Sequence, residues 1–298
     1  MKKIGFVGLG IMGKPMAKNL LKKGYELTVY DIVPESVEAL VKEGARKAAS
    51  CKEAAQGNDI VITMLPNSPH VKEAVSGPEG ILTGAKKDLI LADMSSISPV
   101  AAKEIARECE KAGVIYLDCP VSGGEPKAVD GTLSIMCGGP ESAFEEVKEL
   151  LLCMGASAVL VGDVGSGSIT KLANQIIVAL NIAAMGEAMA LAAKSGVDPA
   201  RVFDAIKGGL AGSTVLNAKM PMVINRNFQP GFRIALHIKD LNNALEAGKD
   251  AGMPLELTQT ALDMLLELDG QGGGALDHSA LVQHFEKLGN VVIQSPKA

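Results

Sequence analysis

The stretch Ile4-Gly5-Phe6-Val7-Gly8-Leu9-Gly10-Ile11-Met12-Gly13 decides the fold of the first half of the chain. Its first four residues form a short, mainly apolar run, which predicts a buried strand. A helical pattern follows over 12–23. The three later glycines have the spacing G-x-G-x-x-G between this strand and this helix, which is typical of the first turn of a dinucleotide-binding βαβ unit.

Each residue of this turn has a physical task in such a unit. Gly8 permits the tight turn, Gly10 lets a pyrophosphate approach the backbone, and Gly13 permits close packing of the helix on the strand. The free N–H groups and the positive dipole end of the helix, next to Ile11 and Met12, then face the phosphates. A plain glycine turn is the alternative, and it is disfavoured by the strand before the motif and the helix after it.

An acidic residue follows the second predicted strand, 27–30. Asp31 lies 31 − 13 = 18 residues beyond Gly13. At this place a carboxylate accepts hydrogen bonds from the adenosine ribose and repels a 2′-phosphate. Residues 32–41 contain no Lys or Arg that could receive such a phosphate. The pattern predicts NAD(H) in preference to NADP(H), and a turn cap before Pro34 is the alternative role of Asp31.

The first half of the chain alternates apolar strands with helices. We predict strands over 4–7, 27–30, 59–65, 89–92 and 115–117, and helices over 12–23, 34–43 and 99–111. Strands that are apolar on both faces indicate a parallel sheet covered on both sides. An antiparallel strand over 132–137, a helix over 142–153 and a last strand over 158–161 complete this part.

The second half shows helical patterns only. They cover 168–195, 199–207, 215–224, 237–251, 255–268 and 280–288. The sequence therefore predicts a Rossmann-type α/β dinucleotide-binding domain over 1–163, a glycine-rich hinge at 162–167, and an all-α domain over 164–298 that a long helix links to it.

Composition and charge exclude several function classes. The 298 residues sum to 29 − 34 = −5 charges, aromatic residues make up 3%, and Trp is absent, so nucleic acid is not an expected partner. The apolar stretch 172–193 contains Asn174, Gln175, Asn181 and Glu187, which favours a buried helix over a membrane span.

Cysteine and histidine usage points in the same direction. Five Cys without a C-x-x-C pair indicate reduced thiols and a cytoplasmic protein. The four His have no metal-ligand spacing, so no metal is expected.

Four segments together resemble a known family. They are Phe6–Gly13, Asp118-Cys119-Pro120-Val121-Ser122-Gly123-Gly124, Gly167-Ser168-Ile169-Thr170-Lys171-Leu172-Ala173-Asn174, and Lys239-Asp240-Leu241. On these residues the chain resembles the β-hydroxyacid dehydrogenases, the group of 3-hydroxyisobutyrate dehydrogenase. The runs 227–240 and 277–281 are most similar to members that reduce tartronate semialdehyde, 2-hydroxy-3-oxopropionate.

The resemblance implies that Lys171 is the catalytic residue. Reduction of an aldehyde leaves charge on oxygen, and a nearby ammonium can stabilise this charge and donate a proton. Lysine suits both directions because burial can tune its pKa, whereas arginine stays charged. A solvated helix lysine is the alternative. Asn174 shares the helix face of Lys171, and by resemblance it orients the substrate or the lysine; Gln175 lies on the same face.

The resemblance also implies the other site residues. Ser122, Gly123 and Gly124 bind the substrate carboxylate through a hydroxyl and unobstructed N–H groups, with a plain turn as the alternative. Lys239 reaches the nicotinamide or the substrate and Asp240 positions it, with a surface ion pair as the alternative. The implied cofactor contacts beyond the glycine turn are Leu65, Pro66, Asn67, Ser96 and Lys239. Phe232 and His237 are pocket candidates, although His237 also suits a hydrogen-bonded core position.

The implied activity is the reversible, NADH-dependent reduction of tartronate semialdehyde to D-glycerate. Oxidation of 3-hydroxyisobutyrate, or of a related short β-hydroxyacid, is the alternative within the family. A non-catalytic dinucleotide-binding module is an alternative from another class, and the presence of Lys171 beside Asn174 favours an enzyme. The expected partners are a small carboxylate substrate and further copies of the chain, as a homodimer or homotetramer.

Overall fold

The computed structural model describes residues 2–295 of the chain, and these form two compact units that divide between Lys171 and Leu172. The division falls inside helix α9 (Ser166–Lys194) rather than between 163 and 164. The physical reason is that the first turn of α9 is attached to the first unit: the N–H of Ser168 donates to the carboxylate of Asp118 at 2.7 Å. The hinge predicted at 162–167 thus includes the start of a helix.

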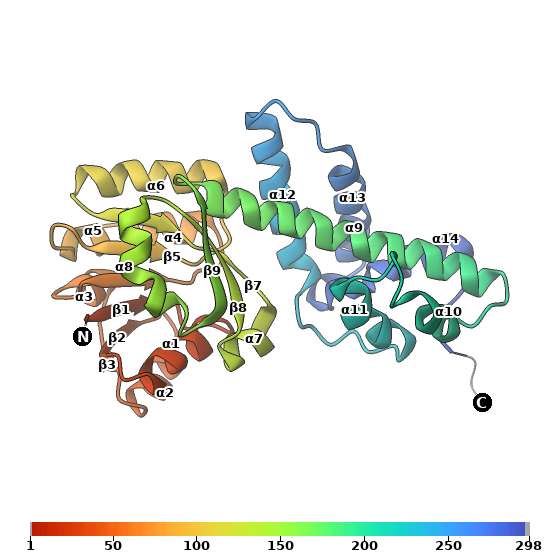
Figure 1. Cartoon of the computed structure of the whole chain (residues 1–298), viewed down its shortest axis with the longest axis horizontal. Coiled ribbons are helices and arrows are strands. Elements are labelled where there is room, and N and C mark those ends of the chain that lie inside the picture. Colours follow the sequence, from red (N-terminus) through yellow and green to blue (C-terminus); the bar gives the residue numbers. More distant parts are fainter. Residues whose placement is uncertain (1, 296–298) are drawn as a thin grey trace. The chain divides into compact units, whose positions relative to one another are not determined.

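The first unit is built on a nine-stranded sheet (Figure 1). Its order is β3-β2-β1-β4-β5-β6-β8-β7, and β9 pairs with β8. Strands β1 to β6 are parallel, whereas β8 runs antiparallel to β6 and β7. The predicted parallel sheet and its antiparallel addition are therefore confirmed. The strands are β1 Ile4–Val7, β2 Leu27–Tyr30, β3 Arg46–Lys47, β4 Ile60–Thr63, β5 Ile90–Asp93, β6 Ile115–Asp118, β7 Val121–Ser122, β8 Leu133–Gly138 and β9 Gly155–Gly162.

Helices cover both faces of this sheet, because successive strand residues point to opposite sides. Ile60 and Ile62 belong to a core with α1, α2 and α8, whereas Val61 between them belongs to a second core with α3 to α6. These helices are α1 Gly13–Lys22, α2 Pro34–Val41, α3 Cys51–Ala55, α4 Ser68–Ser76, α5 Ile81–Gly84, α6 Pro99–Lys111, α7 Gly124–Asp130 and α8 Glu141–Leu151.

Several short elements were not predicted, namely β3, β7, α3, α4, α5 and α7. Their four to nine helical residues, or two strand residues, are too few for a clear periodicity. Local caps start two of them: the Ser50 side chain accepts the N–H of Glu53 before α3, and Asn67 accepts the N–H of Ser68 before α4.

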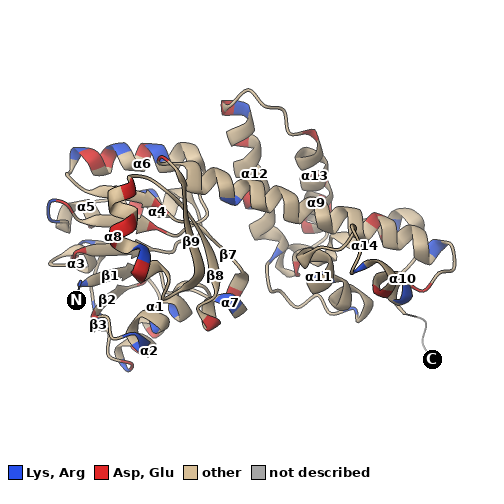
Figure 2. Cartoon of the chain, viewed as in Figure 1, with Lys and Arg blue, Asp and Glu red and all other residues tan. Residues whose placement is uncertain are grey.

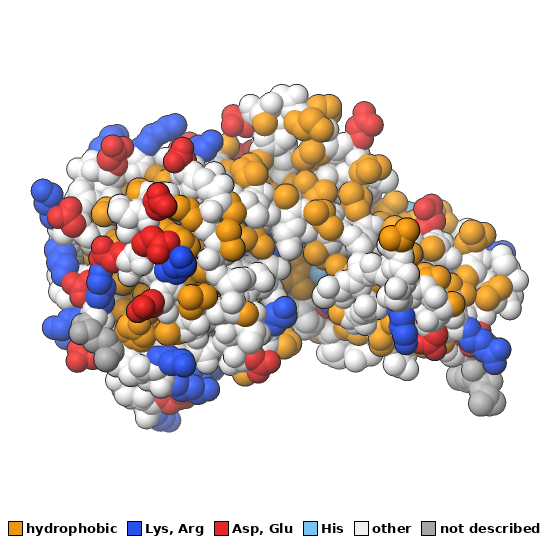
Figure 3. All heavy atoms as spheres, in the orientation of Figure 1, with side chains coloured by type: hydrophobic (Ala, Val, Ile, Leu, Met, Phe, Trp, Pro, Cys, Tyr) orange, Lys and Arg blue, Asp and Glu red, His pale blue; other side chains and the backbone are white. Residues whose placement is uncertain are grey.

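The second unit is helical, as predicted. The predicted helix at 237–251 begins at Ile234 instead, and Gly273–Ala275 form a short 3₁₀ turn. Beside α9, its elements are α10 Pro199–Ile206, α11 Thr214–Ile224, α12 Ile234–Asp250, α13 Glu256–Gly270, η1 Gly273–Ala275, η2 His278–Leu281 and α14 Val282–Gly289. In Figure 3, many hydrophobic side chains lie on the surface of the second unit, and many Lys, Arg, Asp and Glu side chains lie on the surface of the first unit.

Helix α9 is 29 residues long and carries few charges (Figure 2). By length and composition alone it could cross a membrane, with a mean hydropathy of 1.9 in its most apolar window, of which 33% is buried. Ala179, Ile182 and Met185 pack in the core of the second unit. An apolar core helix of a globular domain has the same composition, so this test is weak evidence for a span.

Candidate functional site

The carboxyl ends of the parallel strands define the first part of the site. The strand order reverses at β1, because β2 and β3 lie on one side of it and β4 to β6 on the other. Ligands of open α/β sheets bind where the order reverses, outside the carboxyl ends of the strands. Gly8 follows β1 and Leu65 lies just beyond β4, so both predicted loops lie at this edge.

The three glycines of the first turn differ in what they permit. Gly8 has φ +96°, and a Cβ there would lie 2.3 Å from the carbonyl oxygen of Met64. A Cβ on Gly13 would lie 1.9 Å from the carbonyl oxygen of Gly8. A Cβ on Gly10 would meet nothing within 4 Å. The fold therefore requires Gly8 and Gly13, whereas Gly10 leaves open space above the backbone, as a pyrophosphate would need.

Asp31 holds this turn in place. Its carboxylate accepts the N–H of Leu9, and its other oxygen accepts the N–H of Val33 at 2.8 Å. The second bond is the turn-capping contact that the sequence left open as an alternative role. A groove of about 520 Å³ opens beside Gly10 and Ile11 and is also lined by Lys14. These residues fit a bound dinucleotide at the start of α1.

The loops after β4 and β5 are hydrogen-bonded to each other. The N–H of Leu65 donates to Oγ of Ser95 at 2.8 Å, next to the predicted contact residue Ser96. The amide oxygen of Asn67 caps α4, a structural task that the sequence did not indicate.

Asp93 lies at the end of β5, next to these loops, and its carboxylate accepts hydrogen bonds from three residues. The hydroxyls of Thr63 and Tyr116 donate to its carboxylate at 2.8 and 3.2 Å, and the N–H of Ser95 donates at 3.1 Å. Burial raises the pKa of Asp93, and these hydrogen bonds offset part of the increase.

The predicted carboxylate-binding residues lie at a sharp turn. Ser122 ends the short strand β7, and Gly123 and Gly124 have φ +143° and +70°. A Cβ on Gly123 would lie 2.7 Å from Cβ of Lys127, so this turn has no room for a larger residue at position 123.

Lys171 lies in the second turn of α9 and Asn174 lies three positions further on. Only 6% of Lys171 is exposed, which differs from the solvated helix lysine that was the alternative. Lys171 belongs to the first unit and Asn174 to the second, so the two predicted residues lie on opposite sides of a division that falls within α9.

A chain of polar contacts in the second unit joins four predicted residues. Nδ2 of Asn174 donates to Oε1 of Gln175 at 2.8 Å, and Nε2 of Gln175 donates to the Asp240 carboxylate at 2.6 Å. The ammonium of Lys239 lies 3.1 Å from the other oxygen of Asp240. The side chain of Asp240 is 2% exposed, so its pair with Lys239 is not the exposed surface ion pair that was the alternative.

His237 and His278 form a buried pair, whereas the sequence indicated His237 only as a single candidate residue. Nε2 of His237 lies 3.1 Å from the carbonyl oxygen of Gln175, and its Nδ1 lies 3.0 Å from Nδ1 of His278. A carbonyl oxygen only accepts, so Nε2 of His237 carries a hydrogen. In a neutral His237, Nδ1 is therefore the acceptor and Nδ1 of His278 donates. The ring of Phe232 packs edge-on against both imidazoles, with centroids 5.7 and 5.3 Å away.

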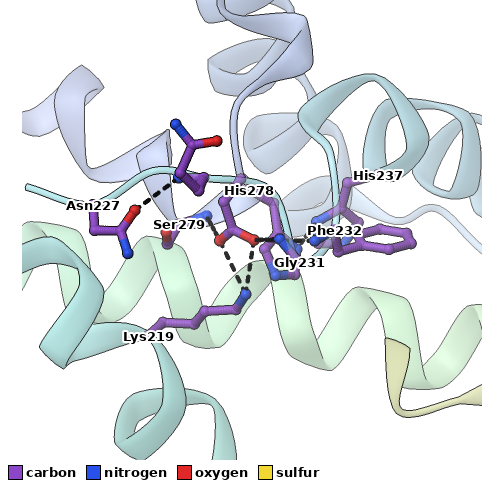
Figure 4. Close-up of polar contacts among 9 residues, drawn as sticks. Lys219, Asn227, Gly231, Phe232, His237, His278 and Ser279 are labelled. Atoms are coloured by element: carbon purple, nitrogen blue, oxygen red, sulfur yellow. Dashed lines mark hydrogen bonds and ion pairs between the residues drawn. The ribbon is translucent and has the colours of Figure 1, made fainter. Parts of the chain in front are cut away.

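Asp277 holds the loop that precedes α12. Lys219 reaches its carboxylate at 2.9 and 3.0 Å, and the N–H groups of Gly231, Phe232 and Ser279 donate to it at 2.9 to 3.0 Å (Figure 4). Burial alone would raise the pKa of Asp277, but His278, Lys219 and these donors lower it to about 2.

We expect Asp277→Asn to lower the free energy of unfolding by about 3–5 kcal/mol, because it leaves the largely buried Lys219 without its counter-ion. The contribution of Asp277 is complete above its ordinary pKa of about 3.9 and is lost as the pH falls toward 2. Urea unfolding between pH 2 and 7 measures both effects. An unfolding free energy equal to the wild type at pH 7 would contradict this account.

Within residues 2–295, no group of three or more His, Cys, Asp or Glu side chains is placed to hold a metal ion. A hydrogen bond with Cys137 and burial raise the pKa of Cys119 well above its usual value, so this thiol, which lies three residues before Ser122, stays protonated.

The glycine turn at the sheet edge and the lysine-bearing helix that follows the sheet define an oxidoreductase that binds a nicotinamide dinucleotide. Comparisons with known families agree. Residues 3–162 match the NAD binding domain of 6-phosphogluconate dehydrogenase, and residues 165–285 match the model described as NAD-binding of NADP-dependent 3-hydroxyisobutyrate dehydrogenase.

Individual proteins are similar over almost the whole chain. The 2-hydroxy-3-oxopropionate reductase of Escherichia coli (strain K12) is 46% identical, covering 97% of this chain and 98% of that protein. The mitochondrial 3-hydroxyisobutyrate dehydrogenase of Mus musculus is 38% identical, covering 95% and 87%. The structure of Mycobacterium tuberculosis 3-hydroxyisobutyrate dehydrogenase with L-serine has a TM-score of 0.89 at 32% identity, covering 95% and 98%. The chain belongs to the β-hydroxyacid dehydrogenase family.

Proposed function

We propose that this enzyme reduces tartronate semialdehyde to D-glycerate with NADH. The observation that carries the proposal is the 46% identity over 97% of the chain to the Escherichia coli 2-hydroxy-3-oxopropionate reductase. Lys171 on α9 and the turn Ser122-Gly123-Gly124 supply the two groups that such a reaction needs from the protein.

The chemistry assigns a task to each of these groups. The reduced nicotinamide supplies a hydride to the aldehyde carbon. Nζ of Lys171 gives a proton to the carbonyl oxygen, so the carbonyl becomes a hydroxyl and the ammonium becomes an amine that solvent reprotonates. Ser122, Gly123 and Gly124 hold the carboxylate. Asn174, joined through Gln175 to Asp240, keeps the polar groups of its helix face oriented.

A second candidate function is the oxidation of 3-hydroxyisobutyrate, which the 38% identity to the mouse enzyme supports. The two substrates differ at the α carbon, which bears a hydroxyl in one and a methyl group in the other. A site that hydrogen-bonds a substrate hydroxyl rejects the analogue without it by about 10⁴–10⁵, whereas an apolar site discriminates by about 10².

A substrate panel separates the candidates. We expect kcat/KM for tartronate semialdehyde with NADH to exceed that for methylmalonate semialdehyde by a factor of about 10² or more. The matching alcohols, tested with NAD⁺, give the reverse direction. A preference for methylmalonate semialdehyde and 3-hydroxyisobutyrate would replace the proposed substrate with the second candidate.

We also propose that NADH is preferred over NADPH, although the family model of the second domain is described from NADP-dependent enzymes. Asp31 is the supporting residue. Replacement by Asn keeps an oxygen that can accept one of the N–H groups of Leu9 and Val33 but removes the charge that repels a 2′-phosphate.

We expect Asp31→Asn to raise the ratio of kcat/KM for NADPH to that for NADH by about tenfold, equivalent to ~1.4 kcal/mol. Glu35→Gln is the matched control, because Glu35 is an exposed carboxylate in the first turn of α2. Steady-state kinetics with both cofactors provide the measurement. An unchanged ratio in Asp31→Asn would show that another residue selects the cofactor.

A further inference from the structure

Helix α9 begins at a residue that cannot cap it. The carbonyl oxygen of Gly165 accepts the first helical N–H, from Ile169 at 2.9 Å, so Gly165 occupies the N-cap position. Ser, Thr, Asp or Asn usually stand there, because their side-chain oxygen accepts an N–H of the first turn. Glycine has no such oxygen, so the first turn of α9 needs an acceptor from elsewhere.

Asp118, at the end of strand β6, provides this acceptor. One carboxylate oxygen accepts the N–H of Gly165 at 2.8 Å, and the other accepts the N–H of Ser168 at 2.7 Å. Ser168 is the third residue of the helix, and its N–H is the one that an N-cap side chain normally binds. Only 1% of Asp118 is exposed. A carboxylate 47 residues away in the chain thus replaces the missing cap.

The surrounding packing leaves the helix start little freedom. A Cβ on Gly167 would lie 2.4 Å from the carbonyl oxygen of Asp118 and 2.5 Å from that of Met136. A Cβ on Gly138 would lie 2.5 Å from the Asp118 carboxylate. The first turn of α9 therefore rests directly on strands β6 and β8, with Asp118 between them.

Asp118 is connected to both predicted site segments of the first unit, by hydrogen bonds to the start of α9 and by the short stretch of chain that leads to the predicted substrate-binding turn. Lys171 follows Ser168 by one turn of the helix, and the turn Ser122-Gly123-Gly124 follows Asp118 directly after Cys119, Pro120 and Val121. All of these residues belong to the first unit. We propose that Asp118 is a positioning residue: by anchoring the first turn of α9 to the end of β6, its carboxylate holds Lys171 in place relative to the substrate-binding turn. The proposal rests on the proposed function of these residues.

The anchor depends on the charge of Asp118. The carboxylate faces the positive end of the helix dipole, and protonation removes this charge and weakens one of its two acceptor oxygens. Burial raises the pKa of Asp118 to about 6, although the N–H groups of Gly165 and Ser168 lower it in part. The anchor is therefore half protonated near pH 6, forms fully as the pH rises above this value, and weakens below it.

Other ionisable groups surround Asp118. Asp93 is its register partner on β5, and Tyr116 on β6 and Cys119 directly after β6 interact with its charge. Cys137 on β8 is hydrogen-bonded to Cys119, and Lys103 on α6 lies beside Gly165. The raised pKa means that the native state binds this proton more readily than the unfolded chain, so the contribution of Asp118 to stability falls as the pH rises from about 4 to 6. As the pH falls below 6, Asp118 therefore positions Lys171 less well but contributes more to the stability of the fold.

The test compares Asp118→Asn with Asp93→Asn, using the best substrate of the panel between pH 5 and 8. Asp93 is the matched control because it is also a buried strand-end carboxylate with a raised pKa, but the hydrogen bonds that it accepts come from Thr63, Ser95 and Tyr116, which lie outside α9. In the wild type we expect kcat to fall with pH below about 6. Asp118→Asn should lower kcat at pH 7.5 by about 10²-fold, the usual cost of a 1 Å misplacement. Its kcat should then be independent of pH, and its Kd for NADH should match that of the wild type.

Two results would overturn the proposal. One is that Asp118→Asn keeps the decline of kcat below pH 6, and the other is that Asp93→Asn removes it. If Asp118→Asn does not fold, NMR of the wild type decides: the amide signals of Gly165 and Ser168 should titrate with the midpoint of the kcat profile, and amides that do not titrate reject the anchor. If no substrate of the panel is turned over, the proposed function fails, whereas this amide titration still tests the anchor by itself.

Discussion

Lys171→Met is expected to lower kcat for the reduction by a factor of about 10²–10⁴, the usual contribution of a positioned general acid. Methionine keeps most of the length of the side chain and its apolar packing, but it has no proton to donate and no charge to stabilise the developing oxyanion. Binding of NADH should be nearly unchanged, because the glycine turn and Asp31 lie elsewhere in the first unit. Steady-state kinetics and NADH fluorescence titration measure the two quantities.

Lys194→Met is the control for this variant. Lys194 lies in the last turn of the same helix and is exposed, so its loss should leave kcat unaffected. A Lys171→Met enzyme with the kcat of the wild type would remove Lys171 from the reaction. A variant that loses NADH binding together with turnover would show that the lysine acts on the cofactor rather than on the carbonyl oxygen.

The second large effect is expected from Gly13→Ala, compared with Gly10→Ala. The new Cβ at position 13 would lie 1.9 Å from the carbonyl oxygen of Gly8, so α1 must move away from β1. We expect a loss of about 1–3 kcal/mol or more in the free energy of unfolding, the cost of forcing extra atoms into a packed core. We expect NADH binding to be lost with it, because we place the dinucleotide at the first turn of α1.

Gly10→Ala separates binding from folding. Its Cβ would meet no protein atom within 4 Å, so the thermal unfolding midpoint should stay at the wild-type value. The Kd for NADH should rise by about tenfold or more, since ~1.4 kcal/mol corresponds to tenfold and the methyl group stands where the pyrophosphate approaches. Gly10→Ala with unchanged NADH affinity would place the dinucleotide away from this turn.

Much of this fold is predictable because its signals are local. The strands at Ile4–Val7, Leu27–Tyr30 and Ile115–Asp118 are apolar on both faces and are bounded by turn residues, which is the pattern of a buried parallel sheet. The glycine turn is predictable for the same reason, since its strand, glycines and helix are contiguous. Pro34 at the start of α2 gives a boundary of the same local kind.

The rest depends on contacts between distant residues. No local pattern indicates that Asp118 caps a helix at Gly165, because the signal at that helix start is the absence of a capping side chain. The pairing of His237 with His278 and the contacts of Asp277 with Lys219 likewise join separate helices and loops. Two features of the sequence could nevertheless have drawn attention to these contacts. One is the glycine, Gly165, at the N-cap of the long helix, and the other is the pair Asp277-His278 directly before the predicted helix at 280–288.

The polar chain of the second unit shows how a motif can indicate a residue without its partner. Lys239 and Asp240 were predicted as neighbours in a helix, where adjacent residues do not normally face each other. In the structure they form a pair. Gln175 binds one carboxylate oxygen of Asp240, and the ammonium of Lys239 lies beside the other oxygen. Asn174 joins the same chain through Gln175, so Gln175 connects the predicted residues.

The central claim is that this chain passes hydride from a reduced nicotinamide to the aldehyde carbon of tartronate semialdehyde, which is the β carbon of this acid. The most direct measurement supplies NADH deuterated at the transferable ring position together with tartronate semialdehyde, and analyses the product by NMR. The account predicts D-glycerate with one deuterium on its β carbon for each NADH consumed. NADH that is consumed without deuterium appearing at that carbon, or a wild-type enzyme that forms no glycerate, would contradict it.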